Sequence, residues 1–225
     1  MIPPDSLQPA SVNDLRVAQK GGDFIIYWSK PTRAEGGRSL KGLAGFDLYR
    51  REVLPAGQDC EECPDAYRLL RRIDLDYPQG GVASGNLLVV LDSGATVGTT
   101  YQYKVVAWNR DGAKSRDSLR ARRKMVEALP PPAVEAVGSP AAITLTIRPP
   151  ALAGRGNLLG CNVYRAGEGS DSPRLLNQSP VECAVYDDNV LEKGKSYQYS
   201  VRAVAQIDGE IIESVPSPGV SVRVP

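Results

Sequence analysis

Two of the four cysteines in this 225-residue chain form a C-x-x-C pair, Cys60 and Cys63, within 58-QDCEECPD-65. This spacing occurs in thiol redox centres, in zinc sites and in c-type haem attachment. The chain contains no histidine, and Pro64 stands where haem attachment requires one. The pair is therefore not a haem anchor, and the lack of histidine also removes the commonest general base and metal ligand.

The surroundings of the pair argue against redox and metal chemistry. A thioredoxin-type centre needs a helix that starts at the first cysteine, but 67-YRLLRRIDL-75 alternates like a strand. The adjacent Glu61 and Glu62 would raise a thiol pKa instead of lowering it. A structural zinc site needs four converging ligands, and the remaining cysteines lie far along the chain. We therefore favour a local Cys60–Cys63 disulfide, with a redox centre and a zinc site as the alternatives.

Other strings that imitate catalytic motifs fail on context. The triplet 194-GKS-196 has Asn189 where a phosphate-binding loop needs glycine, and a strand follows it instead of a helix. The run 154-GRGNLLG-160 has one residue too many between its last glycines for a dinucleotide fingerprint. No histidine is present to complete a serine or cysteine triad. We predict a protein that is not an enzyme, with no catalytic residues, no cofactor and no metal site.

The same unit occurs twice along the chain. The run 98-GTTYQYKVVAWNRDG-112 returns as 194-GKSYQYSVRAVAQIDG-209, 46-FDLYR-50 as 161-CNVYR-165, and 24-FIIYWSKP-31 as 143-ITLTIRPP-150. Echoes in the same order indicate a tandem repeat. The prolines of 128-ALPPPAV-134 favour an extended connection between the copies. We predict an N-terminal tether at 1–8, domains at 9–128 and 133–225, and a proline linker at 129–132.

Each copy is predicted to be all-β. Tyr101, Tyr103, Val105 and Ala107 alternate with other residues as in a half-buried strand. Further strands of the first copy are predicted at 12–18, 23–29, 45–53, 66–75, 86–92 and 117–126. Short strands at this density, separated by glycine and proline, are typical of a two-sheet β-sandwich.

These residues resemble the fibronectin type III domain. The resemblance rests on 28-WSKP-31, on 46-FDLY-49, and on the G-x-x-Y-x-Y run that places Tyr101 and Tyr197 in tyrosine-corner positions. It covers nearly the whole chain and implies two tandem immunoglobulin-like (fibronectin type III) β-sandwiches. Each corner tyrosine is then expected to bury its ring and to reach a nearby backbone group with its hydroxyl. The second copy carries Ile147 in place of the tryptophan, so its core must be filled differently.

The repeat also locates the cysteines. The first copy is longer by about 19 residues between its third and sixth strands, because the LYR/VYR echo is offset by 115 positions and the tyrosine echo by 96. The segment 54–66, with its C-x-x-C pair, is therefore an insertion. Cys161 matches the inward-pointing Phe46, whereas simple alternation from Tyr186 places Cys183 on the opposite face. With a bulge to bring Cys183 round, we expect a Cys161–Cys183 disulfide, and two buried free thiols are the alternative.

A basic stripe is predicted on one face of the first domain. Alternation places Arg120, Arg122 and Lys124 on one face of its last strand. In a fibronectin-like sandwich the third, fourth, sixth and seventh strands share a sheet, so Arg51, Arg68, Arg72 and Lys104 are expected beside them. The stripe is either a solvated edge that prevents strand addition or a docking surface for an acidic protein, a lipid phosphate or a polysaccharide. Nucleic acid is not expected, because aromatics are few and the net charge is +1.

The composition and the N-terminal residues bear on location. No stretch has the length and apolarity of a membrane-spanning helix, and 1-MIPPDSLQPA-10 lacks the apolar core of a secretory signal. An even number of cysteines suits two disulfides in an oxidising compartment. The stretch 3-PPDSLQPASVNDLRV-17 resembles the start of the mature region of bacterial lipoproteins with fibronectin-type domains. That resemblance implies a location in the periplasm or at the outer membrane. It also implies that a signal and lipid anchor have been removed from this chain, and that this anchor would be the only attachment to a membrane.

We therefore expect a non-catalytic binding or spacer protein of the bacterial cell envelope, whose partner is a protein or an envelope polysaccharide. The alternative is an accessory module of a secreted carbohydrate-active enzyme, which would present exposed aromatic rings for sugar stacking. Trp108 and a few tyrosines are the candidates for that role.

Overall fold

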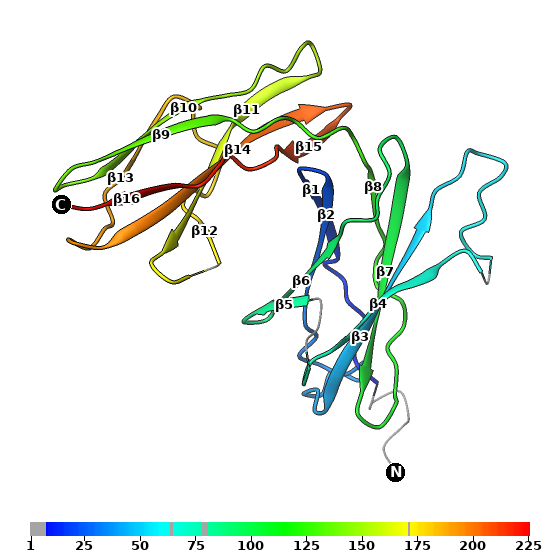
Figure 1. The fold of residues 1–225 in the computed structure, drawn as a ribbon. Coiled ribbons are helices and arrows are strands. Elements are labelled where there is room, and N and C mark those ends of the chain that lie inside the picture. The colour runs from blue at the N-terminus through cyan, green and yellow to red at the C-terminus, as the bar shows by residue number, and fades with distance from the viewer. Residues whose placement is uncertain (1–7, 64, 78–80, 171) are drawn as a thin grey trace. The chain divides into compact units, whose positions relative to one another are not determined.

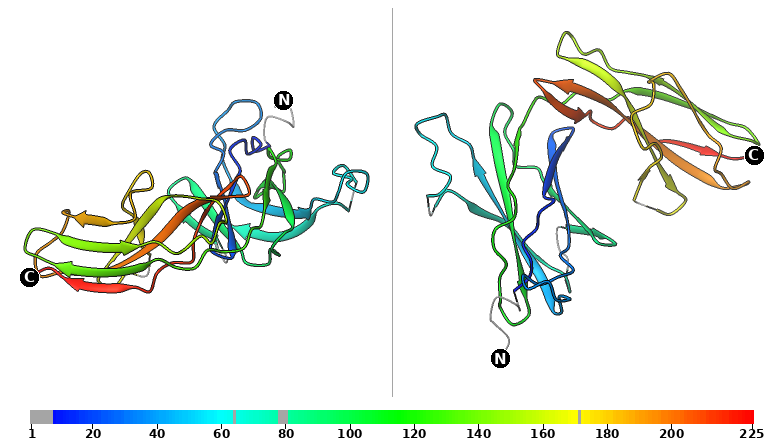
Figure 2. Two further views of the ribbon diagram at one scale, coloured as in Figure 1. Left: turned by 90° about the horizontal axis from the view of Figure 1, so that it is seen from above. Right: turned by 180° about the vertical axis from the view of Figure 1, so that it is seen from behind.

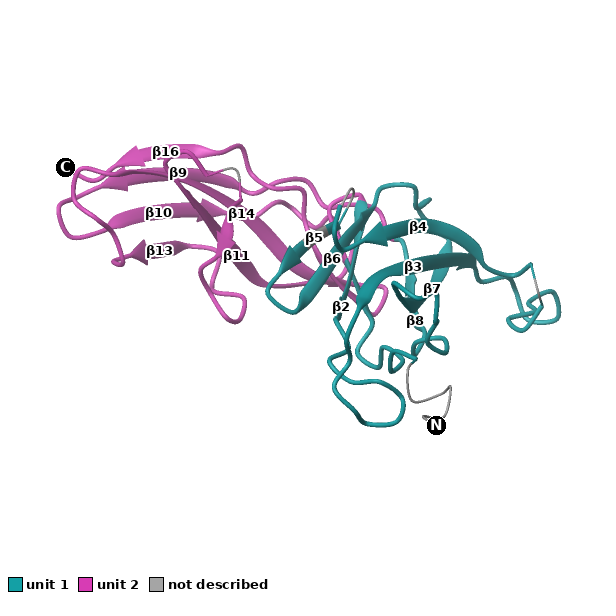
Figure 3. Ribbon diagram, turned by 90° about the horizontal axis from the view of Figure 1, so that it is seen from below, with its two compact units in different colours: residues 1–18, 23–125 teal, residues 19–22, 126–225 magenta. Residues whose placement is uncertain are grey.

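The computed structural model describes residues 8–63, 65–77, 81–170 and 172–225, so the predicted tether at 1–8 lies outside them except for its last residue. The chain divides into two compact units (Figure 3). Unit 1 comprises residues 1–18 and 23–125, and unit 2 comprises residues 19–22 and 126–225. The segment predicted as a proline linker belongs to unit 2, where Leu129 is fully buried in a small apolar cluster with Val126 and Ile212.

Unit 1 consists of two β-sheets (Figures 1 and 2). Its strands are β1 (Arg16–Lys20, of which the last two residues are assigned to unit 2), β2 (Asp23–Ser29), β3 (Leu43–Glu52), β4 (Arg68–Asp74), β5 (Gly81–Ser84), β6 (Leu87–Asp92), β7 (Thr100–Asn109) and β8 (Ala121–Lys124). One sheet has the order β1-β2-β6-β5 and the other the order β4-β3-β7-β8. The second sheet contains the four strands that were predicted to share one.

Unit 2 repeats this plan. Its strands are β9 (Ala133–Gly138), β10 (Ile143–Arg148), β11 (Asn157–Gly167), β12 (Arg174–Leu175), β13 (Val185–Asp188), β14 (Ser196–Ile207), β15 (Glu210–Glu213) and β16 (Val220–Arg223). One sheet has the order β13-β10-β9, and the other joins β12, β11 and β14. The first half of β14 pairs with β16 and the second half with β15. The predicted fold class, two tandem immunoglobulin-like β-sandwiches of the fibronectin type III kind, is confirmed.

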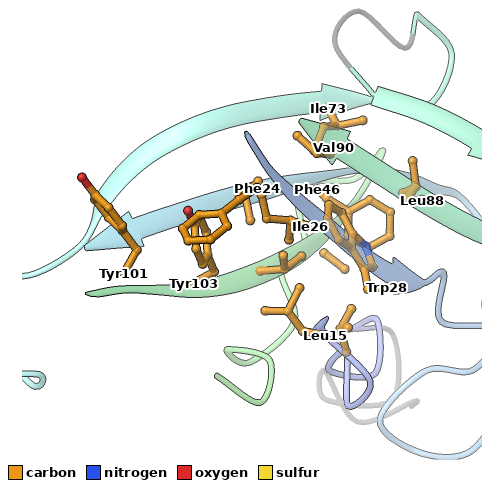
Figure 4. Close-up of a cluster of buried hydrophobic side chains, with 14 of the residues drawn as sticks. Leu15, Phe24, Ile26, Trp28, Phe46, Ile73, Leu88, Val90, Tyr101 and Tyr103 are labelled. Carbon is orange, nitrogen blue, oxygen red and sulfur yellow. The ribbon is translucent and has the colours of Figure 1, made fainter. Parts of the chain in front are cut away.

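The core of unit 1 forms because inward and outward positions alternate along its strands. Figure 4 shows the aromatic residues of β2, β3 and β7 meeting between the two sheets. Phe24 packs edge-on against Tyr101 and Tyr103, and Trp28 packs against Phe46 with ring centroids 5.5 Å apart. All five rings are almost completely buried, so this cluster supplies much of the hydrophobic stabilisation of the unit.

Unit 2 fills the equivalent part of its core with a disulfide. Ile147 stands where unit 1 has Trp28, and Cys161 stands where unit 1 has Phe46. Cys161 is fully buried and is bonded to Cys183, as predicted, but Cys183 lies in the segment before β13 and not at a bulge within a strand. A covalent link from β11 to the segment before β13 therefore takes the place of the aromatic pair.

Both predicted tyrosine corners are present. The backbone N–H of Thr96 donates to the hydroxyl oxygen of Tyr101 at 3.1 Å. The backbone N–H of Glu192 donates to the hydroxyl oxygen of Tyr197 at 2.9 Å. The same hydrogen bond thus fixes the connection before the β7 and β14 strands in the two units.

A second repeated feature, which the sequence analysis did not predict, is a Ser-x-x-Ser segment after each of these long strands. The hydroxyl oxygens of Ser115 and Ser118 accept hydrogen bonds from backbone N–H groups of β7. Those of Ser214 and Ser217 accept equivalent bonds from β14. These serines satisfy buried backbone donors on the edge of β7 away from β3 and on the edge of β14 away from β11, where β8 reaches only Thr100–Tyr103 and the partners β16 and β15 leave residues 200–203 uncovered.

Three strand assignments differ from the prediction. The first strand begins at Arg16 instead of residue 12, and the last strand of unit 1 covers only Ala121–Lys124. The earlier part of that predicted strand contains the serine-bonded segment, which removes it from regular pairing. The strand β5 was not predicted, because its residues read as a glycine-rich loop.

Candidate binding surface of unit 1

The outer face of the sheet β4-β3-β7-β8 carries most of the predicted basic stripe. Arg51 of β3 lies opposite Gln102 of β7, which in turn lies opposite Arg122 of β8. Residues that face one another across neighbouring strands project from the same side of a sheet. The register therefore places five stripe residues on this face: Arg51, Arg72, Lys104, Arg122 and Lys124. Arg120, which precedes β8, reaches the same face, because it binds the Glu61 carboxylate that also binds Gln102.

Arg68 is the exception, and the prediction that it shares this face is wrong. The pairing register of β3 and β4 shifts at a β-bulge around Leu70. Arg72 lies opposite Asp47, but Arg68 lies opposite Arg50, whose side chain points toward the other sheet. The extra residue in the bulge reverses the alternation, so Arg68 and Arg72 project from opposite faces.

The insertion between β3 and β4 forms the protruding end of this hairpin (Figures 1 and 2). The predicted Cys60–Cys63 disulfide closes it. Arg51 donates two hydrogen bonds to the carboxylate of Asp59, at 2.5 and 3.0 Å, and a third to the side-chain oxygen of Gln102 at 2.8 Å. Only 3% of the Arg51 side chain is exposed, so this cation is covered by the insertion instead of being presented to solvent.

The two glutamates between the cysteines bind a second cation. The carboxylate of Glu61 accepts hydrogen bonds from Gln102, at 3.0 Å, and from Arg120. Glu62 accepts one from the same guanidinium at 2.9 Å. The insertion therefore places its own carboxylates on the cations of the stripe.

Tyr67, at the end of the insertion, lies among three of these cations. The Nζ of Lys104 is 4.4 Å from its ring centroid, and the guanidinium carbons of Arg51 and Arg120 are 5.7 and 6.0 Å away. Lys104 also forms an ion pair with Asp117 at 2.8 Å. These contacts join the insertion, β7 and the segment before β8 into one charged surface with an aromatic centre.

Two carboxylates of this face have shifted pKa values. Burial by itself would raise the pKa of Asp47, but hydrogen bonds and charge from Arg72 and Lys114 outweigh it and hold the pKa below its ordinary value. The hydrogen bonds from Arg51 lower the pKa of Asp59. Both groups therefore remain ionised partners of the stripe well into the acidic range.

Two hollows flank the insertion. One, of about 470 Å³, is lined by Tyr49, Tyr67, Lys104, Arg120 and Glu62, among others. The other, of about 580 Å³, lies on the far side of the insertion and is lined by residues that include Arg50, Arg68, Leu54 and Leu70. The insertion thus borders two hollows on the surface of unit 1 that a sheet without it would lack.

A buried charge network recurs in both units at equivalent positions. In unit 1 the Asp92 carboxylate accepts hydrogen bonds from Tyr103 at 2.7 Å, from Arg50 at 2.9 Å and from the backbone N–H of Gly94 at 3.0 Å. The guanidinium of Arg50 lies over the ring of Tyr101 with a separation of 4.8 Å. The carboxylate is therefore almost fully paired inside the sandwich.

Unit 2 reproduces each of these contacts. The Asp188 carboxylate accepts hydrogen bonds from Arg165 at 2.7 Å, from Tyr199 at 2.8 Å and from the backbone N–H of Val190 at 3.1 Å. Arg165 lies 4.9 Å from the ring centroid of Tyr197. Arg50 and Arg165 end the LYR and VYR echoes, and Asp92 and Asp188 are 96 positions apart, as are the corner tyrosines. The repeat in the sequence could therefore have predicted this network. The network is structural, because it is enclosed in each sandwich.

We expect both units to lose stability in alkali because of these networks. Burial and the adjacent aspartate raise the pKa of Tyr103 and of Tyr199 above the ordinary value of about 10. The folded state then keeps a proton that the unfolded state releases, so stability is complete below about pH 10 and falls as the pH rises further, by up to about 1.4 kcal/mol per pH unit for each tyrosine. Urea unfolding from about pH 8 to pH 11 measures this slope. Tyr103→Phe should flatten it, and an unchanged slope in that variant would contradict the assignment.

Trp108, the candidate for sugar stacking, is packed into the surface. Its ring lies against the backbone of Gly45, where a Cβ atom would collide with it. The guanidinium of Arg72 lies 5.9 Å from its ring centroid. The ring is half-buried in these contacts, so it does not form an open platform.

The described residues contain no group of three or more cysteine, aspartate or glutamate residues placed to hold a metal ion. They also contain no helix with the length and apolarity needed to cross a membrane.

Comparisons with known proteins add little to this account. No family model matches the chain, and no curated protein matches it. Among solved structures, it is similar to the FN1–FN3 domains of chicken contactin (CNTN1), with a TM-score of 0.38 and 17% sequence identity over 97% of this chain and 69% of that one. The fold assignment rests on the sheet order, the alternation and the tyrosine corners described above.

Proposed function

We propose that the chain is a non-catalytic binding and spacer protein of the bacterial cell envelope, and that it engages its partner through the outer face of the β4-β3-β7-β8 sheet in unit 1. The difference between the two units carries this proposal. Both build the same sandwich, yet among the described residues only unit 1 has a disulfide-closed insertion, which places charges, an aromatic ring and one hollow on the outer face and borders a second hollow on its far side. Because unit 2 folds without such an insertion, stability of the sandwich does not account for it.

The disulfides support a location outside the cytoplasm. All four cysteines are paired, two in the exposed insertion and two between β11 and the segment before β13 of unit 2. Such bonds persist in oxidising compartments and are rare in the cytosol. A periplasmic or outer-membrane location accords with this pairing and with the resemblance of the N-terminal stretch to lipoproteins.

The alternative, an accessory module of a secreted carbohydrate-active enzyme, has weaker support. Sugar stacking needs an open aromatic ring, and Trp108 is half-buried against Gly45 and Arg72. Tyr67 is likewise surrounded by cations. A charged protein surface is the better match to this face.

Charge reversal on the face tests the proposal. The variant R120E/R122E/K124E should reduce capture of the partner from periplasmic extract by about tenfold or more, because like charges would oppose an acidic surface. Quantitative mass spectrometry of the captured proteins measures the loss.

The matched control carries the same change of charge in unit 2. The variant R174E/K193E/K195E reverses three exposed cations there and should leave capture unaltered. Equal capture by the wild-type chain and R120E/R122E/K124E would reject the face as the binding site.

A further inference from the structure

We propose that the insertion acts as a built-in competitor for an acidic polypeptide segment, and that binding replaces Glu61 and Glu62 on Arg120 by carboxylates of the partner. This inference rests on the proposed function and names the partner chemistry and the regulation of the same face. The ligand class is an extended, aspartate- or glutamate-rich stretch of another protein.

The ion pairs of the insertion divide into an inner and an outer set. Arg51 and Asp59 form the inner pair, with 3% and 21% of their side chains exposed. Arg120 and Glu62 form the outer pair, with 30% and 81% exposed. Glu61 lies between the two sets, since it is 3.6 Å from Arg51 and also binds Arg120.

The two sets differ in what separation would cost. An exposed ion pair contributes little to stability, because water solvates both groups when they part. A buried pair is strongly destabilising to break, because a desolvated charge is left behind. The outer contacts can therefore be exchanged for those of a ligand while Arg51 and Asp59 hold the insertion in place.

The positions already occupied indicate the chemistry of the ligand. The short stretch from Asp59 to Glu62 binds guanidinium groups of two separate segments. Asp59 binds Arg51 of β3, and Glu62 binds Arg120, which lies just before β8. Arg122 and Lys124 are exposed and continue the same face beyond Arg120 along the edge strand β8. An acidic chain longer than the insertion would extend along β8 and contact Arg120 and these two cations together.

The Cys60–Cys63 bond fits this role. It closes a loop in which Glu61 and Glu62 are the two central residues. Limiting the conformations of so short a loop keeps both carboxylates near Arg120 at high effective concentration. The competitor is consequently always present, and a ligand must exceed it in charge or length.

Binding of a synthetic oligoglutamate peptide to the full chain, measured by fluorescence anisotropy, tests the exchange. Glu62→Gln removes half of the outer competition and should tighten binding roughly two- to fivefold, and E61Q/E62Q should tighten it further. The control Glu168→Gln makes the same change of net charge at an exposed site of unit 2 and should leave affinity unchanged.

Each result decides the matter. Tighter binding by E62Q but not by E168Q supports the exchange. Unchanged or weaker binding by E62Q overturns it. If R120E/R122E/K124E nevertheless loses the natural partner, the proposed function still stands, because the partner then binds this face without displacing the glutamates. Binding of a sulfated oligosaccharide in preference to oligoglutamate also overturns it and assigns the face to a polysaccharide.

Discussion

Replacing Asp188 by asparagine should lower the free energy of unfolding of unit 2 by about 3 kcal/mol. The substitution keeps the shape of the side chain but removes the charge that Arg165 and Tyr199 bind inside the sandwich. Only 10% of the Arg165 side chain is exposed, so its cation would be left desolvated without a counter-ion. Peptide-resolved hydrogen exchange should show the slowest amides of β14 exchanging about a hundredfold faster.

The neighbouring residue provides the control. Asp187 is exposed and accepts a hydrogen bond from Thr144, which an asparagine oxygen can also accept. Asp187→Asn should therefore change stability by less than about 0.5 kcal/mol. Equal effects of the two substitutions would show that the buried network does not stabilise the unit.

The equivalent substitution in unit 1, Asp92→Asn, should have a similar but smaller effect. A quarter of the Arg50 side chain is exposed, so water can partly solvate its charge when the carboxylate is lost. Both tryptophans, Trp28 and Trp108, belong to unit 1. The unfolding transition seen by tryptophan fluorescence is therefore the direct readout for this variant.

The second large effect is expected from removing the Cys161–Cys183 disulfide of unit 2. The double variant C161A/C183A should lose about 3 kcal/mol, because the bond closes a loop with a sequence separation of 22 and restricts the unfolded chain. The loss of packing at the fully buried Cys161 acts in the same direction. Cys161 belongs to the same core cluster as Ile147, which is smaller than the tryptophan at the equivalent position of unit 1. Urea unfolding followed by far-ultraviolet circular dichroism measures the change.

The other disulfide is the control for this prediction. Cys60 and Cys63 are separated by three positions, so C60A/C63A should cost less, about 1.6 kcal/mol by the same loop-entropy argument, and should act on unit 1. If C161A/C183A unfolds at the wild-type urea concentration, the bond does not replace the aromatic packing that unit 1 uses.

The regular parts of the fold were accessible from the sequence. Alternation along 101-YQYKVVA-107 and its echo predicted the long central strands, and the G-x-x-Y-x-Y run predicted both tyrosine corners. These features are local and periodic, so the pattern of residue types specifies them.

The charged surface was accessible only in part. Alternation placed Arg120, Arg122 and Lys124 correctly, but it failed at Arg68, because a bulge can follow any of several positions in 68-RLLRRID-74. It also missed that Asp59 and the two glutamates bind the stripe. An irregular loop has no period from which its direction can be read.

The central claim is that the partner contacts the outer face of the β4-β3-β7-β8 sheet, and a photo-crosslinking residue at Arg122 tests it most directly. Arg122 is exposed on β8, opposite Gln102 of β7. Benzoylphenylalanine at position 122, irradiated in the cell envelope, should yield a covalent adduct with a partner protein, and the same residue at the exposed Arg174 of unit 2 should yield none. An adduct at position 174 with none at position 122 would contradict the account.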